Sequence, residues 1–487
     1  MVYNKLKVLF ASAEVSPFAK TGGLADVAGS LPKELSQLGH EVRIVMPRYG
    51  SINIDTQYVC DIGVTIGDRK ETCIIKQYTI SDDKDGTIPV YFIENHHYFN
   101  RSGIYCYHDD GERFLLLCKT VLEMLPAIDF VPDIIHCNDW HTGPICLLLK
   151  EKYKDLENYK NISTVYTIHN LEYQGNFGAD ILRYLNLDSD YFTSEKAEFY
   201  GMFSFMKCGL VYADVINTVS KQYAKEILTP AYGERMEGVL QHRQKDLFGI
   251  VNGISYSEFD PENKGDLYAN YNSSSVALKK KNKDMLRKEL GLSNVNGPLC
   301  GVVTRLSSQK GLELLLGAID EMIVKHDAQL VVLGLGDEYY QTAFTALQKK
   351  YPAKVAAFFE FNSTLAHRIY AACDIFLMPS RFEPCGLGQI ISMRYGTIPV
   401  VRATGGLAET IIDYDEDRNS ANGFKFYDFT VRAFKKAFER AKDIYANNSM
   451  EWEKLIVRAL ESDFSWKQPC KKYLEIYYKA IENNQKL

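Results

Sequence analysis

Residues 20–27 read KTGGLADV and follow the apolar run at residues 8–13 near the start of the chain. The run predicts a buried strand, and the glycines predict a tight turn that opens into a helix ending near Leu38, before Gly39. A second apolar run at residues 41–46 predicts the next strand. Strand, glycine turn, helix and strand form a βαβ unit, which indicates a doubly wound α/β fold.

The same alternation continues over most of the chain. Apolar runs predict further strands at 89–93, 134–137, 164–168, 215–218, 299–304, 329–333, 355–361, 375–378 and 398–401. The pattern breaks down between about residues 252 and 297 and then begins again. Because 487 residues are too many for one ordinary core, we expect two large α/β domains with this break between them.

Composition narrows the class of protein. The net charge is −6, which argues against binding to nucleic acid or to an anionic membrane. Apolar runs all stay short of the roughly 20 residues that a membrane helix needs, so no membrane association is expected. The 11 cysteines form no Cys-x-x-Cys pair, which is typical of reduced thiols in a cytoplasm.

A second glycine-rich stretch, PSRFEPCGLGQ at residues 379–389, follows the strand predicted at 375–378. Pro384 restricts Glu383 to an extended conformation, and the residues after it offer backbone N–H groups to a hydroxyl or phosphate oxygen. The glycine turn of the first stretch is likewise predicted to point backbone N–H groups into an anion site at a helix N-terminus, and Lys20 adds a cation there. A cation and amides for phosphate, with a carboxylate for a sugar, suggest a nucleotide-sugar enzyme. The alternative for Glu383 is a capping charge before a helix.

Two cations follow the first strand of the second half. Arg305 and Lys310 lie in TRLSSQKG at residues 304–311, at the expected mouth of the sheet. A guanidinium and an ammonium suit a diphosphate and would stabilise its growing charge as it leaves. The alternative is a pair of surface cations near a helix start, although cations there oppose the helix dipole.

Histidines in the first half invite a metal hypothesis. Residues 136–141, HCNDWH, contain possible ligands, but strand neighbours face opposite ways and no third well-spaced ligand follows. We therefore expect no metal, and Asp139 is expected to face a ligand cleft.

His169 and Asn170 end the strand predicted at 164–168. A polar pair there suits hydrogen bonds to a sugar, although a lone histidine is often structural. Cys385 has no visible activating histidine, so a nucleophilic role is not expected.

Taken together, these motifs resemble bacterial glycogen synthase and plant starch synthase, which are retaining glucosyltransferases of the GT-B fold. The resemblance covers almost the whole chain and rests on residues 20–27, 136–142, 167–171, 252–254, 305–311, 380–387 and 404–407. It implies two Rossmann-like domains facing across a deep cleft. Residues 1–250 would form the acceptor-side domain, joined by a returning C-terminal helix at 464–487, and residues 251–463 the nucleotide-sugar domain.

The resemblance also implies residue roles. Those implied to act in catalysis are Glu383, His169, Arg305 and Lys310. Those implied to bind the donor are Lys20, Gly23, Arg305, Lys310, Phe361, Cys385, Gly386, Leu387, Thr404 and Gly405. Those implied to lie towards the acceptor are Asp26, Tyr98, Asp139 and Asn170. Glu383 would support charge at the anomeric carbon, and His169 would hold the 6-hydroxyl region.

Two positions depart from the family pattern. Phe361 stands where bacterial members often have tyrosine. Its ring can still stack on the base, but it lacks the phenol hydroxyl. Asn138 stands where the family commonly has histidine.

The implied activity is transfer of glucose from ADP-glucose to an α-1,4-glucan such as glycogen, without metal or pyridoxal phosphate. The alternatives are a UDP-sugar or sucrose synthase-like GT-B enzyme, and a catalytically silent glucan-binding protein.

Overall fold

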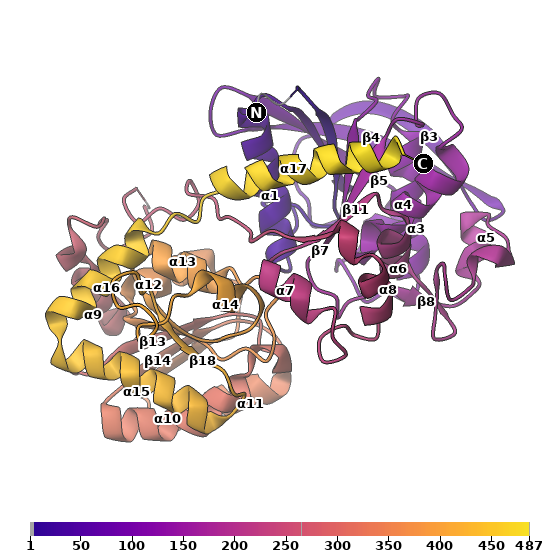
Figure 1. Ribbon diagram of the computed structural model, residues 1–487. Coiled ribbons are helices and arrows are strands. Elements are labelled where there is room, and N and C mark those ends of the chain that lie inside the picture. The colour runs from indigo at the N-terminus through magenta and orange to yellow at the C-terminus, as the bar shows by residue number, and fades with distance from the viewer. Residues whose placement is uncertain (1–3, 264, 487) are drawn as a thin grey trace. The chain divides into compact units, whose positions relative to one another are not determined.

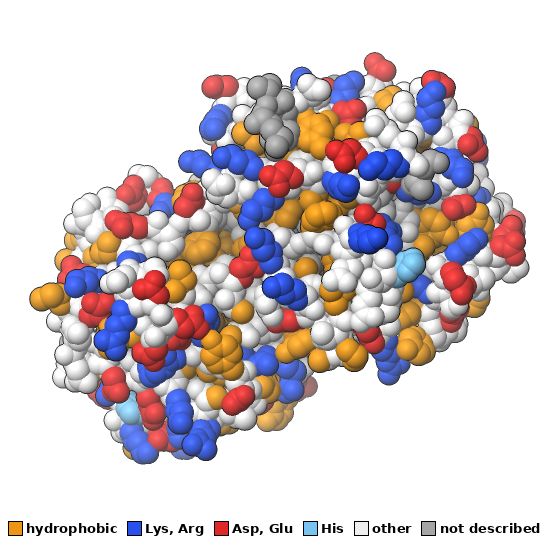
Figure 2. All heavy atoms as spheres, in the orientation of Figure 1, with side chains coloured by type: hydrophobic (Ala, Val, Ile, Leu, Met, Phe, Trp, Pro, Cys, Tyr) orange, Lys and Arg blue, Asp and Glu red, His pale blue; other side chains and the backbone are white. Residues whose placement is uncertain are grey.

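The computed structural model describes residues 4–263 and 265–486, which divide into two compact units (Figure 1). The first unit runs up to Gly253 and resumes at Trp466, and the second runs from Ile254 to Ser465. The sequence places the corresponding boundaries at 250/251 and 463/464. Acidic and basic side chains are interspersed over the visible face of each unit (Figure 2). Among the described residues, every helix is too short or too polar to cross a membrane.

The first unit is built on a mostly parallel sheet of order β12-β11-β7-β6-β1-β2-β5-β4-β3. Its strands are β1 (Lys7–Ala11), β2 (Glu41–Pro47), β3 (Gln57–Ile66), β4 (Arg69–Ser81), β5 (Thr87–Glu94), β6 (Ile134–Asn138), β7 (Ser163–Ile168), β11 (Val215–Thr218) and β12 (Leu247–Gly249). The chain passes from β1 to β2 on one side and later places β6 on the other side of β1. This is a topological switch point, where open α/β sheets bind ligands.

The hairpin β3–β4 is absent from the sequence prediction. It pairs antiparallel with itself and with β5 at the edge of the sheet. Several residues of these strands are exposed, so they lack the continuous apolar run of the buried strands. A separate small sheet consists of β8 (Asn176–Phe177), β10 (Met202–Ser204) and β9 (Glu198–Phe199).

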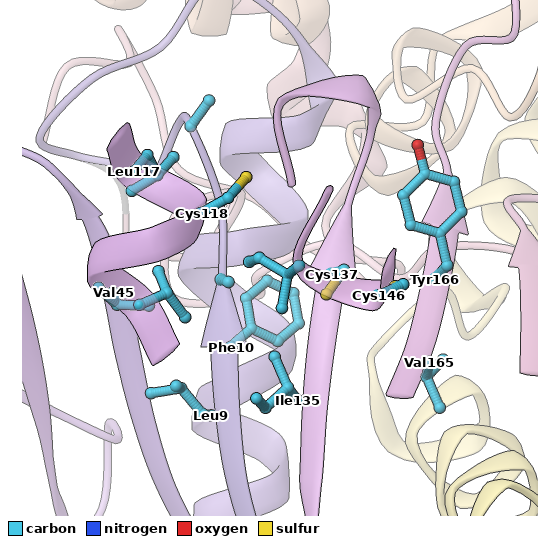
Figure 3. Close-up of a cluster of buried hydrophobic side chains, with 14 of the residues drawn as sticks. Leu9, Phe10, Val45, Leu117, Cys118, Ile135, Cys137, Cys146, Val165 and Tyr166 are labelled. Carbon is cyan, nitrogen blue, oxygen red and sulfur yellow. The ribbon is translucent and has the colours of Figure 1, made fainter. Parts of the chain in front are cut away.

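Helices cover this sheet and bury an apolar core. They are α1 (Gly23–Gln37), α2 (His96–Phe99), α3 (Asp110–Glu123), α4 (Gly143–Leu148), α5 (Ile181–Leu185), α6 (Phe205–Tyr212), α7 (Lys221–Glu226), α8 (Glu237–His242) and α17 (Lys467–Asn484). Cys118, Cys137 and Cys146 lie in the core among aliphatic side chains (Figure 3). Burial raises the pKa of the Cys118 and Cys137 thiols, which makes them packing residues rather than nucleophiles.

The C-terminal helix α17 joins the first unit through a buried polar network. The Tyr477 hydroxyl lies 2.7 Å from His136 Nδ1, and His136 Nε2 lies 2.6 Å from Thr167 Oγ1. Thr167 Oγ1 then donates to Asn217 Oδ1 at 2.5 Å. His136 is therefore hydrogen-bonded by two hydroxyl groups of the core.

The second unit has a fully parallel sheet of order β15-β14-β13-β16-β17-β18. Its strands are β13 (Leu299–Val303), β14 (Gln329–Leu333), β15 (Val355–Phe358), β16 (Ile375–Met378), β17 (Ile398–Arg402) and β18 (Phe424–Phe426). Its helices are α9 (Lys279–Glu289), α10 (Leu312–His326), α11 (Glu338–Lys350), α12 (Ser363–Ala372), α13 (Gly388–Arg394), α14 (Gly405–Thr410), α15 (Val431–Asn447) and α16 (Ser449–Glu461). The strand order reverses between β13 and β16, which is the switch point of this unit.

One strand in the second unit ends earlier than expected. The sequence predicts a strand at 355–361, whereas β15 stops at Phe358. The Asn362 side chain accepts a hydrogen bond from Leu365 N at 2.9 Å and caps α12, so the chain must turn before that residue. Phe361 therefore lies in a loop at the carboxyl end of β15, where its side chain is 75% exposed.

Candidate functional site

The central feature of the second unit is a buried ion pair at its switch point. Lys310, after β13, places Nζ 2.9 Å from Oε1 and 2.7 Å from Oε2 of Glu383, which follows β16. Ser380 Oγ donates to Glu383 Oε2 at 3.0 Å. Glu383 is only 6% exposed, so its charge needs these partners. Two residues predicted to act together from separate motifs are thus in direct contact.

Close backbone contacts hold this pair in place. Gly311, with φ +63°, follows Lys310, and a Cβ there would lie 1.9 Å from the Pro379 carbonyl oxygen. Gly405, with φ +45°, starts α14, and its Cβ would lie 1.9 Å from the Glu383 carbonyl oxygen. Gly406 N–H donates to that same oxygen at 3.2 Å. The glycines are required because three loops meet backbone to backbone around Glu383.

The segment after Glu383 is held from inside the unit. Gln389 Nε2 donates to the carbonyl oxygens of Cys385 at 3.1 Å and Gly386 at 2.8 Å. Gly386 adopts φ +73°, and the Cys385 side chain is buried. Thr404 is buried just before α14, while Arg305 is exposed at the end of β13. The structure therefore places the predicted donor-side residues of this unit along the carboxyl edge of its sheet.

At the switch point of the first unit, a carboxylate occupies part of the glycine turn. Glu14, 4% exposed, accepts hydrogen bonds from Thr21 N at 2.5 Å, Thr21 Oγ1 at 2.7 Å and Gly22 N at 3.3 Å. The sequence predicts that amides of this turn point into an anion site, and this is wrong for Thr21 and Gly22. Lys20 Nζ contacts Asp26 Oδ1 at 2.5 Å.

Glu14 itself was missed by the sequence reasoning. Its carboxylate also accepts a hydrogen bond from the Tyr105 hydroxyl at 2.5 Å, and the Tyr105 ring stacks on His141 at a centroid distance of 4.9 Å. An acidic residue directly after a buried strand was the available signal, but one of its partners, Tyr105, lies 91 residues away. Glu14 thus connects the glycine turn to the segment after β6.

Asp139, His169 and Asn170 come together at the ends of β6 and β7. Asp139 Oδ1 accepts a hydrogen bond from His169 N at 2.7 Å and lies 3.5 Å from Asn170 N. Burial raises the pKa of the Asp139 carboxyl to about 7 and lowers the pKa of His169 to about 3, so this histidine is neutral. His169 is half-buried at the end of β7.

A pocket of about 370 Å³ opens beside this cluster, within the first unit. Its lining includes Trp140, Tyr107 and Tyr173 together with the amides Gln174 and Asn176. Aromatic faces combined with hydrogen-bonding side chains are suited to a sugar ring, which has apolar faces and a polar rim.

Comparison with known proteins agrees with this geometry. The model for the starch synthase catalytic domain matches residues 7–242, and that for glycosyl transferases group 1 matches residues 285–454. A glycogen synthase of Desulforudis audaxviator is 50% identical over 99% of this chain and 98% of its own. A glycogen synthase of Moorella thermoacetica is 49% identical with the same coverage. The chain belongs to the glycogen and starch synthase family.

Solved structures of relatives confirm the fold expected for this family. The catalytic domain of starch synthase IV from Arabidopsis thaliana, bound to ADP and acarbose, superimposes with a TM-score of 0.93 at 32% identity. It covers 98% of this chain, which covers all of that domain. Sucrose-phosphate synthase from Thermosynechococcus elongatus, with a TM-score of 0.60 at 17% identity, shares the fold. The fold is therefore GT-B, as the motifs predict.

Tyr98 does not join the other acceptor-side residues predicted from the family. Its side chain is fully buried, and its hydroxyl donates to Glu112 and accepts from Arg69. Arg113 Nε donates to its carbonyl oxygen at 2.7 Å. Because a buried, satisfied tyrosine presents no group to a glucan, we leave Tyr98 out of the site proposed for this family member.

Buried histidines should make this family member sensitive to acid. Burial holds the pKa of His136 and His141 far below 6.5 and that of His169 at about 3, so the unfolded chain binds more protons below pH 6.5. Asp139, with its pKa raised to about 7, opposes this effect. Lowering the pH from 7.5 to 5.5 should reduce the free energy of unfolding by about 2 kcal/mol, measured by urea denaturation.

The control for this prediction is His97→Gln, which replaces an exposed histidine and should show the same pH dependence as the wild type. Asp139→Asn removes the opposing carboxyl and should enlarge the loss at pH 5.5. A urea midpoint that is equal at the two pH values would contradict the assignment of neutral buried histidines.

Proposed function

We propose that this chain is a glycogen synthase, which transfers glucose from ADP-glucose to the non-reducing 4-hydroxyl of an α-1,4-glucan and retains the anomeric configuration. The observation that carries the proposal is the Lys310–Glu383 pair at the switch point of the second unit. It occurs in a chain that is 50% identical to a glycogen synthase over its length. We further propose that the protein acts in the cytoplasm, where its reduced thiols are stable.

Donor binding is proposed to use the carboxyl edge of the second sheet. Arg305 and Lys310 would hold the diphosphate, and the amides of Cys385, Gly386 and Leu387 would hold sugar hydroxyls. Gly405 contributes through its close contact with the Glu383 loop, and Thr404 precedes it at the start of α14. In the first unit, Lys20 and Gly23 would bind a phosphate oxygen. The ADP in the starch synthase IV structure supports an adenine nucleotide as donor.

In the proposed chemical step, the bond between the anomeric carbon and the diphosphate oxygen breaks, and the acceptor O4 attacks on the same face. The O4 proton passes to a diphosphate oxygen, and ADP leaves. Glu383 stabilises the positive charge that develops at the anomeric carbon. Arg305 and Lys310 neutralise the departing diphosphate, which is why we propose that neither a metal nor pyridoxal phosphate is needed.

The acceptor is proposed to bind in the first unit. Asp139, Asn170 and Asp26 are the predicted residues, and the pocket beside Trp140 offers an aromatic surface for a glucose ring. The acarbose bound in the starch synthase IV structure supports a glucan as the acceptor. The proposed partner is therefore glycogen or a maltooligosaccharide.

Phe361 provides a direct test of the donor. An exposed ring in a loop at the sheet edge is suited to stack on a base, and such stacking contributes about 1–3 kcal/mol per base. Phe361→Ala should therefore raise the KM for ADP-glucose about tenfold or more and leave kcat nearly unchanged. The measurement is ADP release at varied ADP-glucose with saturating glycogen.

Tyr58→Ala is the matched control, because Tyr58 is 59% exposed on β3 at the edge of the first unit. It should leave both constants unchanged.

The wild type should use ADP-glucose at least about tenfold better than UDP-glucose, a difference of about 1.4 kcal/mol. Equal or better kcat/KM with UDP-glucose would favour the alternative, a GT-B enzyme that uses UDP-sugars.

A further inference from the structure

The ring of His169 is oriented by Asn138, the last residue of β6. His169 Nε2 lies 2.9 Å from Asn138 Oδ1. Asn138 is fully buried, whereas His169 is half-buried at the sheet edge. The pair joins the carboxyl ends of adjacent parallel strands, β6 and β7. Nothing in the proposed reaction assigns a role to Asn138, which stands where the family commonly has histidine.

The orientation of the Asn138 amide follows from its other neighbours. Asn138 Nδ2 lies 3.0 Å from the Ala11 carbonyl oxygen and 3.3 Å from the His136 carbonyl oxygen. Carbonyl oxygens only accept, so the NH₂ group must face them and Oδ1 must face the imidazole. Because Oδ1 only accepts as well, His169 Nε2 must carry the proton. The other ring nitrogen, Nδ1, then has a lone pair in the neutral imidazole.

The backbone of His169 is fixed by the next residue. Asp139 Oδ1 accepts from His169 N at 2.7 Å, and Asp139 adopts φ +54° and ψ −179°, a conformation that costs about 1–3 kcal/mol outside glycine. Burial also holds the pKa of His169 near 3, which keeps the ring neutral near pH 7. Two consecutive residues thus fix the ring and the main chain of His169.

We propose that Asn138 is a positioning residue that holds His169 in the Nε2–H tautomer, so that Nδ1 accepts a hydrogen bond from the 6-hydroxyl of the donor glucose. The assignment of the hydroxyl rests on the proposed function, whereas the tautomer does not. A sugar with a carboxylate in place of the 6-hydroxyl has no hydrogen to donate, so its oxygen would face the lone pair of Nδ1 and be repelled. The arrangement therefore selects a hexose with a free 6-hydroxyl.

The tautomer can be measured without activity. Protein labelled with ¹⁵N-histidine at pH 7.5 gives ring nitrogen shifts that distinguish protonated from unprotonated nitrogens, and the spectrum of His169→Gln identifies the signals of His169. The expected result is a protonated Nε2 and an unprotonated Nδ1. A protonated Nδ1 in the wild-type protein would overturn the proposal, and this measurement needs no folded variant of Asn138.

The role in selectivity is tested with ADP-glucose and its 6-deoxy analogue as donors. In the wild type, loss of the 6-hydroxyl should lower kcat/KM by roughly tenfold or more, because Nδ1 is left without a donor. Asn138→Leu should lower kcat/KM for ADP-glucose by a similar factor and abolish most of the difference between the two donors. If Asn138 had a purely structural role, its substitution and the loss of the 6-hydroxyl would act independently, and the difference between the two donors would stay unchanged.

Unlike Asn138→Leu, Asn138→His should retain both rate and selectivity, because one imidazole nitrogen can donate to Ala11 while the other accepts from His169 Nε2. Asn282→Leu is the matched control, since Asn282 is a fully buried amide in the second unit. It should preserve the preference for the 6-hydroxyl. A wild type inactive with ADP-glucose would refute the proposed function, while the nitrogen shifts would still decide the tautomer.

Discussion

Glu383→Gln is expected to lower kcat by about two to three orders of magnitude, as removal of one preorganised electrostatic group does. The substitution keeps the shape of the side chain but removes the charge that stabilises the anomeric carbon in the transition state. The KM for ADP-glucose should change much less, because the arginine and lysine still bind the diphosphate. Steady-state ADP release with saturating glycogen measures both constants.

Two variants in the same unit serve as controls for this prediction. Ser380→Ala removes the hydroxyl that donates to Glu383 Oε2 but keeps the carboxylate, so kcat should stay within about tenfold. Glu313→Gln neutralises a carboxylate that pairs with the exposed Arg381 and should be close to wild type. A near-normal kcat for Glu383→Gln would mean that Glu383 only holds its loop in place.

Gly405→Ala is expected to damage the site through the backbone. The new Cβ would lie 1.9 Å from the Glu383 carbonyl oxygen, at a residue with φ +45°. Backbone strain and overpacking each cost about 1–3 kcal/mol, so the free energy of unfolding of the second unit should fall by roughly 2–6 kcal/mol. Because the Glu383 loop must move, kcat/KM should fall at least about 100-fold. Urea denaturation and ADP release measure the two effects.

Gly291→Ala is the control that separates backbone strain at a positive φ from the close contact of a new Cβ. Gly291 also has a positive φ, +68°, but its Cβ would meet nothing within 4 Å. This variant should lose about 1 kcal/mol of stability and keep its activity. If Gly405→Ala behaves in the same way, the close contact between the α14 turn and the Glu383 loop has no functional consequence.

The central strands could be predicted from the sequence because they are buried on both faces. β13, β14 and β16 are continuous apolar runs, and each was placed to within a residue or so. The edge strands β3 and β4 could not, since their exposed polar residues interrupt the apolar pattern. A run of apolar residues indicates a strand that is buried on both faces, and an edge hairpin is only partly buried.

The candidate site shows the same division. Lys310 and Glu383 could be predicted because each follows a strand at a sheet edge, and the structure brings them into contact. Glu14 and Asn138 could not, because each contacts a side chain far along the chain, 91 residues away for Glu14 and 31 for Asn138. Tyr98 was implied only by the family resemblance, and the structure buries it fully in α2, which the sequence alone does not show.

The central claim is that this chain extends an α-1,4-glucan with glucose from ADP-glucose. The most direct measurement is to incubate the purified protein with ADP-glucose and maltoheptaose, then determine the glucan lengths by mass spectrometry and the new linkage by NMR. The account predicts one ADP released for each glucose added, with only α-1,4 bonds formed. ADP release without longer glucans, or longer glucans with a β linkage, would contradict it.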